Sequence, residues 1–251
     1  MSTPITRLEA VLDIPHDPAT TERADAFWSA LLGWPVSDPW PDHPEFVSFA
    51  PPNGAAYVHR QAVGATAPAT HLDLEVEDLE RATARLTALG ARPVRMTEDW
   101  QTLRSPGGFD FCLVRETSGR RPDPVTEPGG TRRRLAQVCL DVPARHVDAE
   151  LAFWRATLGW SEVACESPEF LTRFVPPAGS PLQVLVQRLG EDDAGLSTRA
   201  HPDLGCDDIE AVADLVVWLG GHRVLTTDGF VSLSDPGGLV FCATANSPDA
   251  P

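Results

Sequence analysis

Residues 26–34, Ala-Phe-Trp-Ser-Ala-Leu-Leu-Gly-Trp, return 126 residues later as residues 152–160, Ala-Phe-Trp-Arg-Ala-Thr-Leu-Gly-Trp. Apolar residues of the first copy fall at i, i+3, i+4 and i+7, from Phe27 to Trp34, which predicts one face of an amphipathic helix. Gly33 stands where the helix would stop, in the cap position that favours glycine. Because this helix end occurs twice, the chain is first interpreted as an internal repeat.

Other short phrases return in the same order in the second half. They are Leu12-Asp13 with Leu140-Asp141, Pro44-Glu45-Phe46 with Pro168-Glu169-Phe170, Pro51-Pro52 with Pro176-Pro177, His59-Arg60 with Gln187-Arg188, His71-Leu72-Asp73-Leu74 with His201-Pro202-Asp203-Leu204, Ser105-Pro106-Gly107-Gly108 with Asp235-Pro236-Gly237-Gly238, and Phe111-Cys112 with Phe241-Cys242. Within each half, a strand, a helix and further strands also occur twice. The chain is therefore predicted to consist of four βαβββ units, paired into two domains.

The domain boundary is predicted from composition. Residues 117–132 lack periodicity and are rich in proline, glycine and charge, which is typical of a linker. This predicts a first domain over residues 1–116 and a second over 133–246. The first helix is expected to begin at Thr20 or Thr21, with Thr21 as its N-cap.

Bulk composition limits the function classes. The length of 251 residues suits two domains, and the net charge of −16 argues against non-specific binding of nucleic acid or anionic membranes. Five cysteines without short spacings do not form a disulfide framework, and no run reaches the roughly 18 apolar residues of a membrane helix. No signal peptide is recognisable at the N-terminus. We therefore expect a cytoplasmic protein, a monomer or a homodimer.

The repeated phrases resemble the vicinal oxygen chelate superfamily, which includes glyoxalases, bleomycin-resistance proteins and extradiol dioxygenases. The resemblance covers residues 5–116 and 133–245. It rests on the strand-Asp-helix opening, the Phe-Trp…Leu-Gly-Trp helix end and the Pro-Gly-Gly turn before a Phe-Cys strand. It implies an α+β fold with two tandem glyoxalase-like domains, in which paired βαβββ units form a curved, partly open mixed sheet.

The resemblance also implies where a divalent metal would bind, on four inward side chains from the first and last strands of each unit. By position these are Glu9, His59, His71 and Cys112 in the first domain, and Gln137, Gln187, His201 and Cys242 in the second. All four residue types of the first set can bind zinc, whereas two amides weaken the second set. Metal-dependent relatives typically have a glutamate at the last position, where this chain has cysteine. We therefore expect no catalytic metal, with a divalent metal in the first domain as the alternative.

The strand pattern independently predicts a wet cleft. Glu9, His71 and Cys112 lie on polar faces of alternating strands, opposite apolar faces. A polar concave face is the usual place for a small ligand. Trp100 and Phe230 precede the Pro-Gly-Gly turns on strands with polar neighbours, and are candidates for stacking on a planar ligand. The expected partner is a small organic molecule.

Three functional hypotheses remain open. The first is a small-molecule-binding protein with a cleft in each domain, which sequesters its ligand or is a divergent enzyme. The second is a metal-dependent lyase, isomerase or dioxygenase acting in the first domain. The third is a structural or interaction protein. Because Gln137 and Gln187 cannot ionise, metal binding and acid–base chemistry are predicted to reside in the first domain. No nucleophile elbow, phosphate loop or dinucleotide fingerprint is present.

Overall fold

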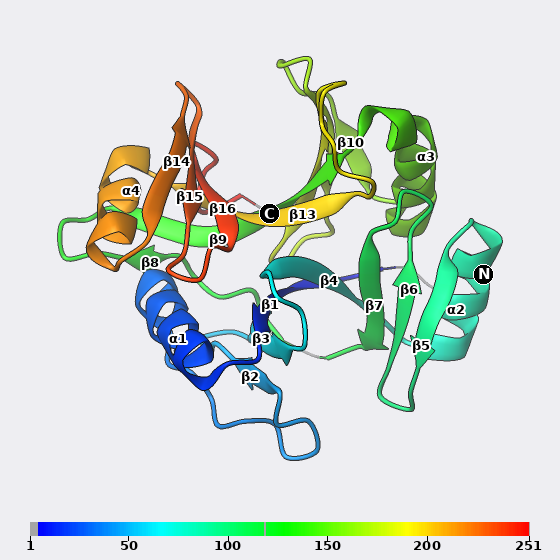
Figure 1. Ribbon diagram of the computed structural model, residues 1–251, viewed down its shortest axis with the longest axis horizontal. Coiled ribbons are helices and arrows are strands. Elements are labelled where there is room, and N and C mark those ends of the chain that lie inside the picture. The colour runs from blue at the N-terminus through cyan, green and yellow to red at the C-terminus, as the bar shows by residue number, and fades with distance from the viewer. Residues whose placement is uncertain (1–4, 118, 251) are drawn as a thin grey trace.

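The computed structural model describes residues 5–117 and 119–250, which form two curved mixed sheets with helices packed against them (Figure 1). The first sheet has seven strands in the order β2-β3-β1-β4-β7-β6-β5, and the second has nine, in the order β10-β11-β12-β9-β13-β16-β15-β14 with β8 beside β9. The first sheet comprises β1 (Leu8–Pro15), β2 (Phe46–Ser48), β3 (Val58–Val63), β4 (Ala69–Val76), β5 (Arg92–Met96), β6 (Trp100–Arg104) and β7 (Asp110–Arg115). The predicted α+β fold is confirmed.

The second sheet follows the plan of the first, with two additional short strands. Its members are β8 (Val125–Thr126), β9 (Arg132–Val142), β10 (Ser161–Val163), β11 (Phe170–Val175), β12 (Gln183–Arg188), β13 (Arg199–Cys206), β14 (His222–Thr226), β15 (Phe230–Ser234) and β16 (Val240–Thr244). Equivalent internal strands link the two parts of each sheet: β1 pairs parallel with β3 and antiparallel with β4, as β9 does with β12 and β13. The segment expected as a plain linker contains β8 and the start of β9.

The helices are α1 (Pro18–Leu32), α2 (Leu79–Ala88), α3 (Val147–Leu158) and α4 (Ile209–Trp218), with a short 3-10 turn at Ala144–His146. Gly33 and Gly159 end α1 and α3 at φ of 68° and 64°, as the repeated phrase predicts. The expected start of the first helix was wrong. Asp17, not Thr21, is the N-cap, because its carboxylate accepts from the Thr20 amide and Pro18 fits the first helical turn. In the described part of the chain, no helix is long and apolar enough to cross a membrane.

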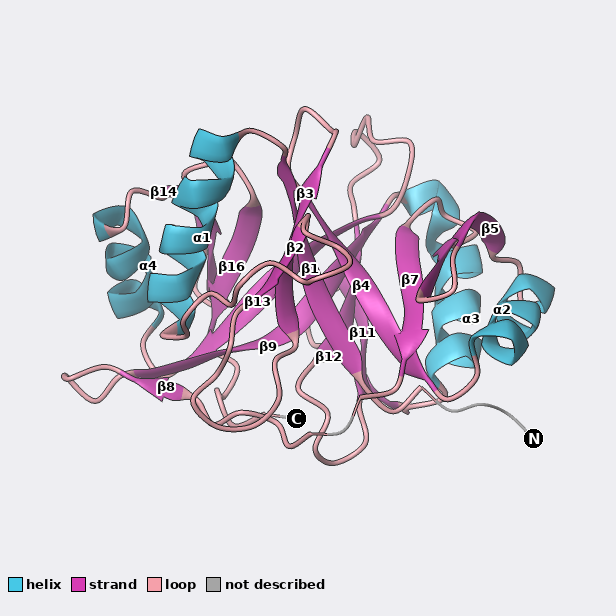
Figure 2. Cartoon of the chain, turned by 90° about the horizontal axis from the view of Figure 1, so that it is seen from below, coloured by secondary structure: helices cyan, strands magenta, loops and turns pink. Residues whose placement is uncertain are grey.

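The helix of the first unit packs against the second sheet. The indole of Trp28 lies 5.0 Å from the ring of Phe241 on β16, and its Nε1 donates to the carboxylate of Asp235 at 3.0 Å. Figure 2 shows α1 beside α4, at the end of the molecule where β16 lies. Helix α1 of the first half is therefore buried partly against the sheet of the second half.

The helix of the third unit makes the reciprocal contact with the first sheet. Trp154 on α3 lies 5.3 Å from the ring of Phe111 on β7. Glu150, also on α3, accepts hydrogen bonds from the Ser105 hydroxyl and the Gly107 amide. Figure 1 places α3 beside α2 and β7, at the far end from α1. Since both helices cross to the other half, the buried apolar residues of the two halves form one continuous core.

Candidate functional site: two clefts with a histidine between carboxylates

Each sheet carries a cavity of about 410 Å³. Of the ten residues predicted to bind a ligand, nine line these cavities, and His59 does not. Cleft 1, in the first half, is lined by the predicted Glu9, His71, Trp100 and Cys112; cleft 2, in the second half, is lined by the predicted Gln137, Gln187, His201, Phe230 and Cys242. The cleft positions follow from the alternation of the strands, and whether these residues bind a ligand stays a prediction.

A histidine lies between two carboxylates in cleft 1. Nδ1 of His71 on β4 is 2.8 Å from Oδ2 of Asp13, at the end of β1. Nε2 of the same ring is 3.4 Å from Oδ1 of Asp73, two residues along β4. The antiparallel pairing of β1 with β4 sets the first contact, because it aligns His71 with Val11 and brings Asp13 within reach.

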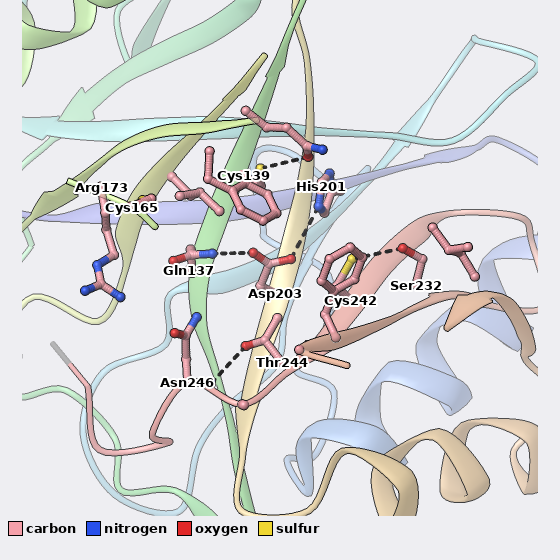
Figure 3. Close-up of a pocket in the computed structure, with 17 residues that line it drawn as sticks. Gln137, Cys139, Cys165, Arg173, His201, Asp203, Ser232, Cys242, Thr244 and Asn246 are labelled. Atoms are coloured by element: carbon pink, nitrogen blue, oxygen red, sulfur yellow. Dashed lines mark hydrogen bonds and ion pairs between the residues drawn. The ribbon is translucent and has the colours of Figure 1, made fainter. Parts of the chain in front are cut away.

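Cleft 2 repeats this arrangement with the same geometry. His201 on β13 places Nδ1 2.9 Å from Asp141 Oδ2 and Nε2 3.4 Å from Asp203 Oδ1. The thiol of Cys242 lies on β16 next to Asp203 in the register, as Cys112 lies next to Asp73 on the first sheet. Figure 3 shows His201, Asp203 and Cys242 together at the centre of the cavity, with Gln137 donating to Asp203.

The carboxylates set the charge of both rings. Burial alone would lower the pKa of His71, but the charge of Asp13 and the hydrogen bonds with Asp13 and Asp73 outweigh burial and hold that pKa well above its usual range. Asp203 and Asp141 do the same for His201 against the effect of burial. The charged form of a half-buried imidazole is therefore favoured between two acidic groups in each cleft, and in that form both ring nitrogens can donate.

The sequence interpretation missed these four aspartates as partners of the histidines. Their signal was present, because Leu-Asp and His-x-Asp occur in both halves at matching places. Strand alternation put Asp13 and His71 on the polar faces of their own strands. It carried no information on the register between the two strands, and the register decides which side chains meet.

The expected correspondence between His59 and Gln187 was wrong by two residues. The register aligns Gln187 with Asp141, and in the first half it aligns Gln61 with Asp13. The counterpart of Gln187 is therefore Gln61, and that of His59 is Leu185.

The first half has an ionisable cluster that the second lacks. His59 Nε2 lies 3.2 Å from Glu9 Oε2, and Arg7 Nε lies 3.6 Å from Glu75 Oε1. Burial and the nearby Glu9 raise the pKa of Glu75 to about 7, although the hydrogen bond from Thr117 acts in the opposite direction. In the register of the second half, Gln137 stands for Glu9 and Gly205 for Glu75. Whether metal binding and acid–base chemistry are confined to the first half stays a prediction.

Aromatic rings form one wall of each cleft. In cleft 1, Trp40 stacks on Phe46 at 5.0 Å, and Trp100 packs edge-to-face against His43 at 4.6 Å. Phe46 and Trp100 also pack edge-to-face, at 6.1 Å, and the corresponding pair in cleft 2, Phe170 and Phe230, does so at 6.2 Å. Trp100 and Phe230 thus lie where the sequence placed them, each facing a cavity.

The donor atoms needed for a divalent metal occur in both clefts. The ligand atoms of His71, Asp73 and Cys112 lie within 4.8 Å of one another, and those of the equivalent trio in cleft 2 do likewise. Oδ1 of Asp73 and of Asp203 is buried, and its 3.4 Å ion-pair contact with Nε2 of the histidine is not a well-formed hydrogen bond. Imidazole, carboxylate and thiolate are zinc ligands, and a carboxylate on Nδ1 commonly orients a metal-binding imidazole. The residues fit a metal once Nε2 releases its proton. Glu9 and His59 belong to neither trio.

The sequence matches one family description in both halves. The description "Glyoxalase-like domain" matches residues 11–114 and 137–244. The chain belongs to the glyoxalase-like family. Its two glyoxalase-like regions coincide with the two sheets and their clefts, so the predicted tandem vicinal oxygen chelate fold is confirmed. Among curated protein sequences, no match was found.

Solved structures share this glyoxalase-like fold at low sequence identity. A Mn(II)-bound glyoxalase from Novosphingobium aromaticivorans has 14% identity and a TM-score of 0.65, over 98% of this chain and 83% of that one. A catechol 2,3-dioxygenase has 16% identity and a TM-score of 0.61, over 100% and 91%. The chain spans only 49% of a xylose isomerase-like TIM barrel/4-hydroxyphenylpyruvate dioxygenase fusion protein, at 14% identity over 97% of this chain and a TM-score of 0.58. These similarities establish the fold alone.

Proposed function

We propose that this protein binds small organic molecules, one in each cleft. The observation that carries the proposal is the duplicated cavity of about 410 Å³, with an aromatic wall above a buried histidine–carboxylate set. Cavities of this size that combine apolar walls with a few convergent polar groups are typical ligand sites. Retention of the same polar set in both halves argues against a purely structural role, which would not need buried charges on two concave faces.

A panel of planar fragments tests this proposal by ligand-observed NMR. Wild-type protein should bind members of the panel, and Trp100→Ala and Phe230→Ala should each remove binding to one cleft only. Trp218→Ala is the matched control, because this tryptophan on α4 is 80% exposed and lines neither cleft. If no fragment binds at millimolar concentration, or if the control loses binding as the cleft variants do, the proposal fails.

A metal-dependent activity is the second candidate function. The His-Asp-Cys trios favour it, and a divalent metal held there would supply Lewis-acid activation of substrate oxygens. In cleft 1 the ligands would be Nε2 of His71, Asp73 and Cys112, with Asp13 orienting the ring through Nδ1. Two structural neighbours are described in terms that fit this chemistry, a Mn(II)-bound glyoxalase and a catechol 2,3-dioxygenase.

Cobalt(II) uptake tests the metal candidate. Addition of Co²⁺ to untagged protein should produce a thiolate-to-cobalt absorption band, and this band should weaken in Cys112→Ser and in Cys242→Ser. Cys206→Ser is the control, because this buried free cysteine lines neither cleft. Absence of the band at excess cobalt, together with absence of metal in the purified protein, would reject the candidate.

We also propose a reducing, cytoplasmic setting and a monomer or homodimer. All five cysteines are free, and four of them are buried. Free thiols persist in reducing compartments. Light scattering coupled to size-exclusion chromatography would give the oligomeric state, and fractionation of the source cells would test the location.

A further inference from the structure

We propose that cleft 2 selects a small aromatic carboxylate and that Arg173 binds the carboxylate group. This inference rests on the proposed small-molecule binding and adds the charge of the ligand and the residue that recognises it. It also separates the two clefts, since the position equivalent to Arg173 in cleft 1 holds Ser48.

Arg173 lines cleft 2 and forms no hydrogen bond or ion pair with the residues that the structure describes. It lies on β11, and the register places it beside Leu185 and in line with Cys139 and His201 across the concave face. Its Nε is buried and has no hydrogen-bond partner among the described residues. In Figure 3 the Arg173 side chain lies among the residues that line the pocket, and no interaction is drawn to its guanidinium.

Other arginines of the second half form ion pairs with nearby carboxylates. Arg199 forms an ion pair with Asp193 at 2.9 Å, and Arg188 with Glu191. A half-buried guanidinium without such a partner is costly, because its charge is partly desolvated and not compensated. An anionic ligand in the cavity would supply the missing partner.

The equivalent position in cleft 1 is occupied differently. The register aligns Ser48 with His59, as it aligns Arg173 with Leu185. The Ser48 hydroxyl accepts from Trp40 Nε1 at 3.0 Å and contacts His59 Nδ1 at 2.9 Å. This corner of the first half is therefore closed by a hydrogen-bonded network of its own side chains. The same corner of the second half holds a guanidinium that forms no ion pair with the described residues.

The charged residues that line the two cavities also favour an anion in cleft 2 over cleft 1. Five carboxylates line cleft 1 against two arginines; the carboxylates belong to Glu9, Asp13, Asp73, Asp99 and Asp110. Among the described residues that line cleft 2, Asp203 is the one carboxylate, and it is already engaged by Gln137 and His201. An anion entering cleft 2 thus meets one free guanidinium and a compensated carboxylate, and the same anion in cleft 1 would meet repulsion.

The rest of cleft 2 fits the body of such a ligand. Phe170 and Phe230 supply two ring faces, and Leu185 and Leu225 add apolar surface. One guanidinium fork matches one carboxylate through two parallel hydrogen bonds, which favours a monocarboxylate over a more highly charged group. The predicted ligand class is therefore an aromatic ring system with a single carboxylate.

Calorimetric titration with three matched naphthalene probes tests the inference: 2-naphthoate, neutral 2-naphthamide and the cation 2-naphthylmethylammonium. Wild-type protein should bind the naphthoate about tenfold or more tightly than the amide, because the charged hydrogen bonds to Arg173 are lost with the amide. Arg173→Gln should abolish this preference while leaving amide binding intact, and Arg173→Lys should retain part of it. Arg188→Gln, a surface change in the same half, and Arg95→Gln, a change in cleft 1, should leave the preference unchanged.

The outcomes separate this inference from the proposed function. Equal affinity for naphthoate and naphthamide, or a preference that survives Arg173→Gln, would overturn the carboxylate assignment and leave small-molecule binding standing. A preference that is lost in Arg95→Gln would place the anion in cleft 1 and also overturn it. Tighter binding of 2-naphthyl phosphate than of 2-naphthoate would replace the carboxylate by a phosphate monoester. If none of the probes binds to either cleft, the proposed function fails as well. Should Arg173→Gln not fold, the wild-type ratio and Arg173→Lys still decide.

Discussion

At the scale of single residues, the same cluster of a histidine and two carboxylates occurs in both halves of this protein. His71 and His201 each lie between two carboxylates, with nearly identical distances in the two halves. Such a cluster is stable in a buried setting only because every charge has a neighbour of opposite sign. The aspartates therefore favour the charged form of both histidines.

Asp13→Asn should lower the pKa of His71 and leave that of His201 unchanged. The amide removes one of the two negative charges that outweigh the effect of burial on the ring. Histidine side-chain NMR over a pH titration measures both values in one sample, and Asp141→Asn provides the mirror experiment for His201. A wild-type His71 that already titrates near the ordinary value for histidine would contradict the charged cluster.

Glu75→Gln should stabilise the protein increasingly as the pH rises. The pKa of Glu75 is raised from 4.5 to about 7 in the folded state, so the folded protein binds more protons than the unfolded chain between these values. The free energy of unfolding of the wild type therefore falls as the pH increases through this window, and glutamine at this position avoids the loss. In urea unfolding, the free energy of unfolding of the variant minus that of the wild type should increase by about 1–3 kcal/mol between about pH 5 and pH 8. Glu80→Gln, at an exposed position of α2, should show no such trend.

At the scale of secondary structure, the two helices with the repeated phrase hold the halves together. Both carry a buried tryptophan whose indole N–H reaches a carboxylate: Trp28 donates to Asp235 at 3.0 Å and Trp154 to Glu150 at 2.6 Å. Asp235 also accepts from backbone amides of its own Pro-Gly-Gly turn, and Glu150 accepts from the Ser105 hydroxyl at the other Pro-Gly-Gly turn. Asp235 and Ser105 occupy equivalent positions, directly before these turns. The repeated helix end thus meets the repeated turn of the other half.

Trp28→Phe should lower the free energy of unfolding by about 2–3 kcal/mol, because it removes a hydrogen bond to a buried charged group. Asp235 is 1% exposed and would keep only its bonds to backbone amides. Trp160→Phe is the control. Its indole donates to the backbone carbonyl of Ile5, a neutral acceptor at a partly buried site, so its cost should be about 1 kcal/mol. Equal losses in urea unfolding would contradict a specific role for the Trp28–Asp235 contact.

At the scale of the whole molecule, the two halves share a core but differ in the clefts they form. The crossing of α1 and α3 makes each sheet dependent on a helix from the other half. The charge of each cleft is set separately by its own residues, with five carboxylates in cleft 1 and Arg173, unpaired among the described residues, in cleft 2. The fold is therefore symmetric in its core and asymmetric in its cavities.

Separate fragments of residues 1–116 and 133–246 should not unfold cooperatively on their own, whereas their mixture should. Each fragment would expose the apolar face that the helix of the other half covers, such as the face of Phe241 that meets Trp28. Cleavage within 117–132 of the intact protein should accordingly leave the two pieces associated in gel filtration. Two independent cooperative transitions of the isolated fragments, seen by near-UV circular dichroism, would show that the halves are autonomous.

The sequence by itself determined the repeat, the fold class and the faces of the strands. These depend on local patterns: glycine at the end of a helix, as at Gly33, and alternation along a strand, as at His71. Only the tertiary structure decided that Asp13 meets His71, that α1 crosses to the second sheet and that Arg173 has no partner among the described residues. The physical reason is that strand register, helix docking and the pairing of a charge are relations between residues far apart in the chain, and local periodicity carries no information about them.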